Sequence, residues 1–170
     1  MTAFIALLRA VNVGGTGKLP MTVLKAMCVD AGFLKVITYI ASGNVVFETG
    51  LTEEQVKQEL EARLKQYAGR PVGLLVRTRD EMSAVLAGNP FPEAAPNRTV
   101  AIFLDEPPPA DALAAIVGRD GEEVLLGVRE IYVHYGTGMA DSRLKIPAAK
   151  AGTARNMNTV AKLVQLAANL

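Results

Sequence analysis

The stretch FIALLRAVNVGGTGKLPM, residues 4–21, decides the expected fold because it joins an apolar strand to a glycine-rich loop and a helix start. Residues 4–8 form a continuous apolar run rather than an alternation, which predicts a strand covered on both faces. The glycines at positions 14, 15 and 17 allow positive φ and a sharp turn. Pro20 suits the start of the helix that follows.

The rest of the first half alternates strands and helices. Residues 33–40 and 45–47 are β-rich runs around Ala41-Ser42-Gly43-Asn44, which predicts a hairpin. A helix begins with a capping box at Thr52 and Gln55, and residues 72–76 add a further strand. The apolar stripe of the helix that begins at Thr52 is Val56, Leu60, Leu64 and Tyr67.

This order, β-α-β-β-α-β, predicts a ferredoxin-like plait over residues 1–78, with sheet order 4-1-3-2. In that topology the loop after the first strand, the hairpin and the turn before the fourth strand lie at one end of the sheet. We therefore expect one rim to collect Arg9, Asn12, Gly14, Gly15, Lys18, Ser42, Asn44 and Arg70.

The second half, residues 79–170, predicts a second plait-like subdomain of order β-α-β-β-α without a last strand. Asp80 can cap a short first helix. We expect strands at 99–104, 123–128 and 130–134, a helix at 110–117, and a final helix from about Thr153 that places Arg155 and Asn156 near its start. The fold class is α+β. Apolar strands on both faces indicate either that the two halves pack their sheets or that a partner subunit covers one.

The segments LLRAVNVGGTGKLPM, TYIASGNVVFE, NPFP and TARNMNTVAKL together resemble the bacterial family called domain of unknown function 1697. The resemblance spans nearly the whole chain. It implies an α/β-plait architecture of two subdomains with no established activity. His134 and Cys28 lie outside the family pattern. The residues that match it are Arg9, Asn12, Gly14, Gly15, Ser42, Gly43, Asn44, Arg155, Asn156 and Thr159.

The glycine loop is neither of the two common phosphate-binding motifs. A Walker loop needs glycine five positions before Gly17 and Ser or Thr after Lys18, where the chain has Asn12 and Leu19. The dinucleotide fingerprint starting at Gly15 would need glycine at position 20. A small anion can still bind backbone amides near a helix start with Arg9 and Lys18 beside them. The alternative is that the glycines only allow a tight turn between the strand and the helix and bind no ligand.

Composition narrows the classes of function. Lys and Arg number 18 against 17 Asp and Glu, and aromatics are 5%, so no basic stripe or stacking platform indicates nucleic-acid binding. One histidine and one cysteine, His134 and Cys28, form no metal-ligand cluster, and no cofactor is expected. The single cysteine suits a reducing cytoplasm, and its apolar helical context predicts a core position. No basic leader or membrane-length apolar run is present.

Three hypotheses remain open from the sequence. The first is a cytoplasmic protein, a binder or an enzyme of unassigned reaction, that holds a small anionic metabolite or nucleotide at the rim. Its charge partners would be Arg9, Lys18 and Arg155, with Asn12, Ser42 and Asn44 orienting the ligand. The second is a nucleic-acid or protein interaction module. The third is that the motif residues only hold the fold together.

Overall fold

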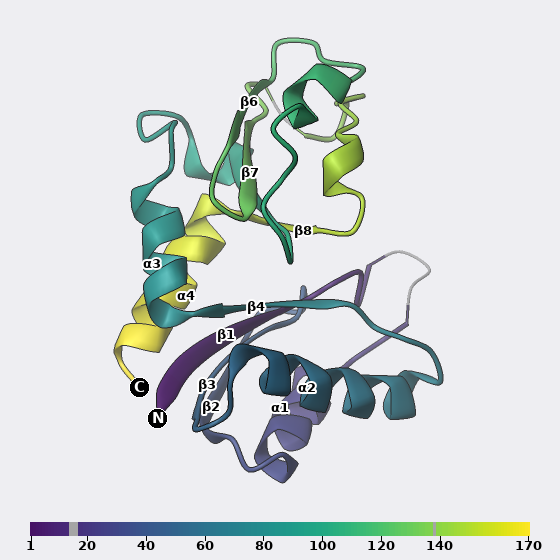
Figure 1. Ribbon diagram of the computed structural model, residues 1–170, viewed down its shortest axis with the longest axis vertical. Coiled ribbons are helices and arrows are strands. Elements are labelled where there is room, and N and C mark those ends of the chain that lie inside the picture. The colour runs from purple at the N-terminus through teal and green to yellow at the C-terminus, as the bar shows by residue number, and fades with distance from the viewer. Residues whose placement is uncertain (14–16, 138) are drawn as a thin grey trace. The chain divides into compact units, whose positions relative to one another are not determined.

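The computed structural model describes residues 1–13, 17–137 and 139–170. These residues form a mixed α+β structure with two four-stranded antiparallel sheets and four α-helices (Figure 1). The chain divides into two compact units, Met1–Ser83 with Lys162–Leu170, and Ala84–Ala161. The sequence-based division at residue 78 assigns residues 79–83 and 162–170 to the second half. In the structure these residues belong to the first unit.

The first unit contains a sheet of order β2-β3-β1-β4, which is the strand order expected from the sequence. β1 is therefore a central strand, paired antiparallel with β3 on one side and with β4 on the other. Helices α1 and α2 cover one face of this sheet (Figure 1). The elements are β1 (Thr2–Leu8), α1 (Met21–Asp30), β2 (Leu34–Tyr39), β3 (Asn44–Thr49), α2 (Glu53–Ala68), β4 (Leu74–Thr78) and the start of α3 (Arg79–Ala87).

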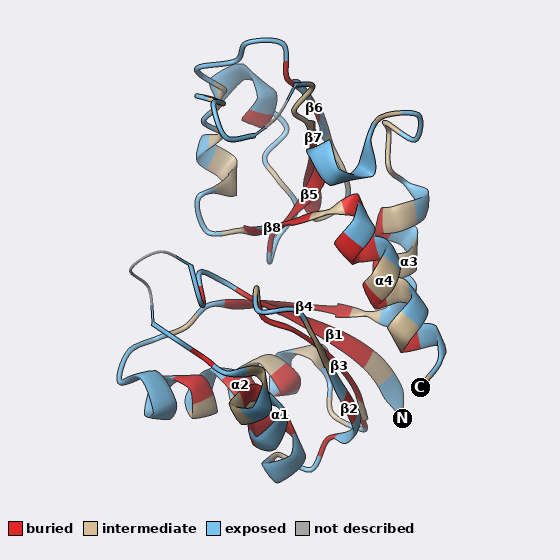
Figure 2. Ribbon diagram, turned by 180° about the vertical axis from the view of Figure 1, so that it is seen from behind, coloured by how far each residue is buried: buried red, intermediate tan, exposed pale blue. Residues whose placement is uncertain are grey.

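The core of this unit lies between the sheet and the two helices. Every residue from position 4 to position 8 of β1 is buried, so the strand is covered on both faces as predicted (Figure 2). Phe4 and Phe47 both lie in the helix-covered core, where Phe47 stacks on Phe33 with ring centroids 4.3 Å apart. Neither ring is therefore exposed for stacking on a nucleic-acid base.

The hairpin between β2 and β3 packs directly against the end of β1. The amide of Leu8 donates to the carbonyl of Gly43 at 2.8 Å. Gly43 has φ +91°, and a Cβ at this position would lie 2.8 Å from Leu8 Cβ and from Val11 Cγ2. Both its backbone conformation and its surroundings therefore require glycine.

Local capping signals define the helix ends. The predicted capping box of α2 is present, because Gln55 N donates to Thr52 Oγ1 and Thr52 N donates to Gln55 Oε1. Gly69 ends α2 in the left-handed conformation, with φ 72°. The expected cap at Asp80 is wrong. Thr78, directly before α3, and Glu81 in its first turn make reciprocal hydrogen bonds of 2.8 and 3.1 Å, because Glu81 stands three residues after Thr78.

The second unit contains a sheet of order β6-β7-β5-β8. One face of the sheet carries an apolar cluster that includes Val100, Ile102 and Val133. The elements are the end of α3, β5 (Thr99–Phe103), β6 (Glu123–Leu126), β7 (Glu130–His134), β8 (Thr153–Asn156), the start of α4 (Met157–Ala168), and short 3₁₀ helices at Pro96–Arg98, Ala112–Ala115 and Pro147–Ala149.

Two expectations for this unit are corrected. Thr153 does not start the last helix. It begins β8, which pairs with β5 from Phe103↔Thr153 to Val100↔Asn156, so the sheet has the fourth strand that the sequence did not predict. Asn156 caps α4 instead, accepting a hydrogen bond from Thr159 N at 2.9 Å. Thr153 and Asn156 are both good capping residues, and pairing with the edge of β5 selects the second.

The helix expected at 110–117 is also wrong, because only Ala112–Ala115 is helical, and that turn is a 3₁₀ helix. The β-branched residues that follow, Ile116 and Val117, are not helical. Ile116 has ψ 136°, and Val117 exchanges two backbone hydrogen bonds with Lys145. Tertiary pairing therefore overrides the helix propensity of the alanines.

None of the described helices is long and apolar enough to cross a bilayer.

The close contact at Gly43 predicts a large, local stability effect. Gly43→Ala should lower the free energy of unfolding by about 2–4 kcal/mol, from left-handed strain plus overlap with Leu8 and Val11. Gly50→Ala is the matched control, because a Cβ there meets no atom within 4 Å. Urea denaturation measures both, and equal stability of the two variants would contradict this account of the hairpin.

Candidate functional site

The loop after β1 is organised by Asn12. Its Nδ2 donates to the carbonyls of Leu19 at 2.8 Å and Ala41 at 2.9 Å, and its Oδ1 accepts from Leu19 N at 2.7 Å. The amide of Asn12 donates to Gly17 O at 3.1 Å. Asn12 has φ 55°, a conformation that asparagine tolerates better than most residues. It therefore positions the loop and ties it to the hairpin.

Ser42 and Asn44 also act within the fold. Asn44 is fully buried, and its Nδ2 donates to Tyr39 O and to Ser42 Oγ, both at 2.9 Å. These bonds close the β2–β3 hairpin from inside. The two residues thus stabilise the turn that carries Gly43, and they do not line the pocket described next.

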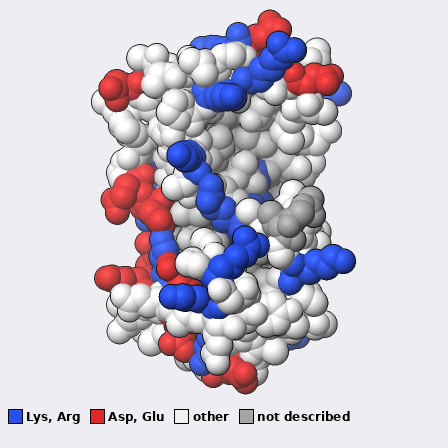
Figure 3. Space-filling view, turned by 90° about the vertical axis from the view of Figure 1, so that its right-hand side faces the viewer, with Lys and Arg blue, Asp and Glu red and all other residues white. Residues whose placement is uncertain are grey.

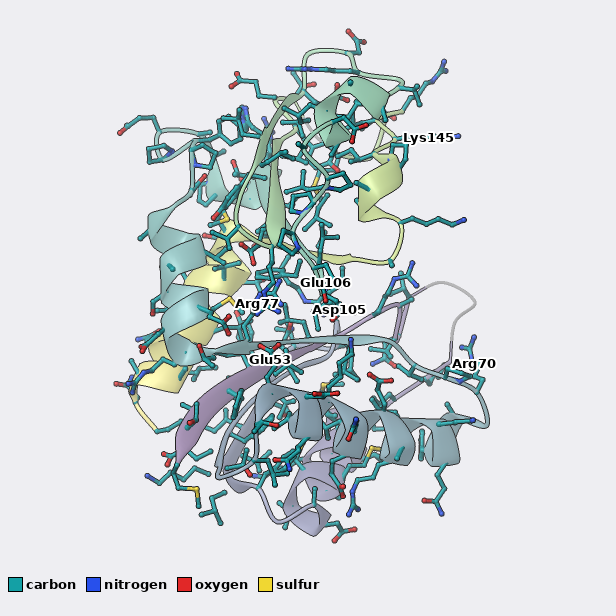
Figure 4. All side chains as sticks on the ribbon, viewed as in Figure 1. Glu53, Arg70, Arg77, Asp105, Glu106 and Lys145 are labelled. Carbon is teal, nitrogen blue, oxygen red and sulfur yellow. The ribbon has the colours of Figure 1, made fainter. Side chains whose placement is uncertain are left out.

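A pocket of about 590 Å³ opens at this end of the first unit. The end of β1 and its loop contribute Arg9 and Lys18, and the connection from α2 to β4 contributes Arg70. Figure 4 places Arg70 in that connection. The full lining is Arg9, Ala10, Val11, Gly17, Lys18, Leu19, Leu64, Tyr67, Ala68, Arg70, Pro71, Val72 and Gly73.

Contacts near this pocket position Arg9 and Arg70. Arg9 N donates to Gly73 O at 2.8 Å, which joins the end of β1 to the start of β4. Arg70 Nη2 would lie 3.2 Å from a Cβ built on Gly17, so its guanidinium lies close to the loop. Arg9, Lys18 and Arg70 thus reach one pocket from three chain segments, with no Asp or Glu among the described lining residues.

The face seen in Figure 3 carries a group of basic side chains. In the lower half of Figure 3, Lys and Arg side chains gather across the face, while Asp and Glu lie mostly toward the left and lower margins. Like charges close together repel, so such a group is favoured when an anion lies between its members.

The expected site residues divide into three sets. Arg9 and Lys18 line the pocket, together with Arg70 from the same predicted rim. Asn12, Ser42 and Asn44 position the loops. Gly14 and Gly15 lie outside the described residues.

Arg155 and Asn156 belong to the second unit. Arg155 is buried in β8, where Nη1 donates to Thr153 Oγ1 at 2.8 Å and to Ala154 O at 3.0 Å. Burial lowers the pKa of Arg155 to about 10, so it stays charged at neutral pH. Asn156 is the cap of α4. The hydrogen bonds just named lie within β8 for Arg155 and at the start of α4 for Asn156.

Tyr67 is the residue of this pocket that sequence patterning misplaced. It continues the apolar stripe of α2, which predicts a buried position, yet it is half exposed and lines the pocket. The usable signal was its place in the last turn before Gly69 and Pro71, where a helix stops following its core-facing stripe.

The second unit has a separate pocket of about 440 Å³ with mixed charge. Glu122 is buried there and accepts from Ser142 Oγ at 2.6 Å and from Asp120 N. These hydrogen bonds, with that of Ser142 foremost, lower the pKa of Glu122. The pKa of Tyr135 is raised mainly by burial and, to a smaller extent, by the negative charge of Glu122. The carboxylate of Glu122 joins the loops around Asp120 and Ser142. Because this lining includes negative charge, the pocket is less suited to binding an anion than the pocket of the first unit.

The thiol is a core residue, whereas the imidazole is half-buried. Cys28 is fully buried in the first core, as predicted. His134 lies in β7, with its ring 5.9 Å from that of Phe91. Among the described residues, no cluster of three His, Cys, Asp or Glu side chains could hold a metal ion.

The family described as protein of unknown function (DUF1697) matches residues 1–132. The chain belongs to this family. The matched region includes every residue that lines the pocket of the first unit, so the pocket lies within the DUF1697 segment.

Among solved structures, the chain is similar over nearly its whole length to the following one. It is described as conserved bacterial protein SP0830 from Streptococcus pneumoniae, with 23% identity, a TM-score of 0.79 and 98% of each chain covered. At this identity the likeness shows the fold alone. No curated protein matches the chain.

Replacing Asn12 should loosen the loop that carries Lys18. Asn12→Ala removes three hydrogen bonds and places alanine at positive φ, so we expect a loss of about 1–3 kcal/mol in the free energy of unfolding. Asn12→Gly keeps the backbone freedom and isolates the side-chain contribution. Asn158→Ala, at an exposed position of α4, is the control. If Asn12→Ala unfolds like that control, Asn12 does not organise the loop.

The buried thiol predicts a pH effect. Burial raises the pKa of Cys28 from 9.0 to about 12, so Ellman's reagent at pH 8 should react at least 100-fold more slowly with the native protein than with the unfolded chain. The stabilisation linked to the neutral thiol is complete below pH about 9 and is lost as pH rises toward 12, because the unfolded thiol ionises first. Native and unfolded rates that agree would show that Cys28 is accessible.

Proposed function

We propose that the protein binds a small organic anion, a phosphorylated metabolite or a nucleotide, in the pocket of the first unit. The observation that supports this most is the charge of the lining: Arg9, Lys18 and Arg70 converge on about 590 Å³ without a lining carboxylate among the described residues. Pockets of roughly 300–1,000 Å³ suit small metabolites and cofactors.

The chemistry of these side chains supports a phosphate or carboxylate group on the ligand. An arginine fork donates two parallel hydrogen bonds to such a group, and lysine supplies a point charge. Each cation is exposed and contributes little alone in water, so several charges acting on one multivalent anion give a stronger interaction. The remaining lining is largely apolar and can contact the rest of the ligand.

The proposal also covers the detailed fold and the cellular compartment. We infer a ferredoxin-like plait for the first half and a related plait-like arrangement for the second, in a protein that works in the cytoplasm. Gly14 and Gly15 are retained as sequence-based candidates for backbone contacts with the anion. In this proposal the described lining residues bind and orient the ligand, and no catalytic step is assigned to them.

Substituting the basic residues tests the proposal. Arg70→Ala and Lys18→Ala should each weaken binding of ATP or pyrophosphate about tenfold, or ~1.4 kcal/mol. The melting temperature of the free protein should stay within about 2 °C, because substitutions of exposed residues change stability little. Titration calorimetry measures the affinity at about 50 mM salt, where exposed charges are screened little.

Arg79→Ala is the matched control, because Arg79 is an exposed arginine of the same unit that lies outside this pocket. A screen of phosphates, nucleotides and carboxylates that never raises the melting temperature would rule the proposed function out. Strong destabilisation by Arg9→Ala, Lys18→Ala and Arg70→Ala without any ligand would instead support a purely structural role.

A further inference from the structure

The pocket of the first unit has two chemically different sides. The end of β1 and the following loop provide Arg9 and Lys18. The last turn of α2 and the segment after it provide mainly apolar and aromatic surface, from Leu64, Tyr67, Ala68, Pro71 and Val72. A ligand that fills both sides must itself have an anionic part and a less polar part.

Tyr67 is the aromatic residue of this lining. The three preceding residues of its stripe, Val56, Leu60 and Leu64, are buried, whereas Tyr67 is 50% exposed. No hydrogen bond of its hydroxyl is found among the described residues. An exposed aromatic ring inside a basic concavity is the arrangement that binds a nucleic-acid base by stacking.

The end of α2 disfavours the anionic part of a ligand. The carbonyl of Lys65 accepts from Gly69 N at 2.8 Å, but in the described structure no backbone amide bonds the carbonyls of the three residues that follow Lys65. Pro71 has no amide to donate. This negative helix end attracts hydrogen-bond donors, such as the exocyclic amino group of adenine or cytosine.

Other anions fit these features less well. Inorganic phosphate would leave most of a pocket of about 590 Å³ and the whole of its apolar side unused. An acyl phosphate would contact the apolar side but would supply no donor to the helix end. A nucleotide with an amino-bearing base satisfies the charge, the ring and the carbonyls together.

We propose, as a refinement that rests on the function proposed above, that the occupant of this pocket is a nucleotide whose base stacks on Tyr67 beside the end of α2 and whose phosphate is bound by Arg9 and Lys18. Arg70 follows Tyr67 by three residues and also lines the pocket, so it can contact the phosphate or the face of the base.

The deciding experiment compares ligands that share the phosphate and differ in the base. Calorimetric titrations of the full chain use ribose 5-phosphate, AMP, inosine monophosphate and adenosine. We expect AMP to bind at least about tenfold more tightly than ribose 5-phosphate, from base stacking. Inosine monophosphate, which replaces the amino group by a carbonyl, and adenosine, which lacks the phosphate, should each bind several-fold more weakly than AMP.

Two variants report on the ring. Tyr67→Ala should lower AMP affinity about tenfold and leave ribose 5-phosphate affinity unchanged, and Tyr67→Phe should retain AMP binding. Lys25→Ala, an exposed cation of α1 that does not line the pocket, is the control for charge. Melting temperatures of all variants establish that they fold.

The outcomes separate this inference from the function on which it rests. Equal binding of AMP and ribose 5-phosphate, with no effect of Tyr67→Ala, would overturn the nucleotide inference while leaving an anion site. Equal binding of AMP and inosine monophosphate would overturn the role assigned to the helix end. If no phosphate compound binds, the proposed function itself fails.

Discussion

The first unit depends on the contact between the end of β1 and the β2–β3 hairpin. β1 is a central strand, so its last residues must satisfy neighbours on both sides before the chain can leave the sheet. Leu8 bonds Gly43 on one side, and Arg9 bonds Gly73 on the other. Only glycine fits against Leu8 and Val11 at position 43. The position of the following loop, and with it Arg9 and Lys18, follows from this junction.

The polar residues near the junction serve two distinct purposes. Asn12 and Asn44 bond backbone carbonyls and hold loops that would otherwise have unpaired polar groups. Arg9, Lys18 and Arg70 instead reach a common space. A sequence pattern in which both kinds of residue stand close together therefore overstates the number of ligand contacts, because part of the pattern stabilises the surface on which the others lie.

Much of the first half could be predicted from sequence because its signals are local. The apolar run of β1, the capping box at Thr52 and the glycines that end the helices specify elements over a few residues each. The order of these elements then led to the strand order and to the rim shared by Arg9, Lys18 and Arg70. Tyr67 was missed because periodicity places a side chain on a helix face but does not show where that face stops meeting the core.

The second half was less predictable because its structure depends on distant pairing. β8 forms along the edge of β5, some fifty residues earlier in the chain, and nothing local separates Thr153 from Asn156 as the helix cap. Val117 pairs with Lys145 for the same reason. Where two readings are locally equivalent, hydrogen bonds made across the fold decide between them.

The division into units has a consequence for synthesis. The first unit consists of Met1–Ser83 and Lys162–Leu170, and the intervening residues form the second unit. A ribosome releases the chain from its N-terminus, so the second unit has all its residues before the first does. The first unit therefore receives the segment Lys162–Leu170 only after the whole second unit has been synthesised, and its N-terminal part must persist unfinished until then.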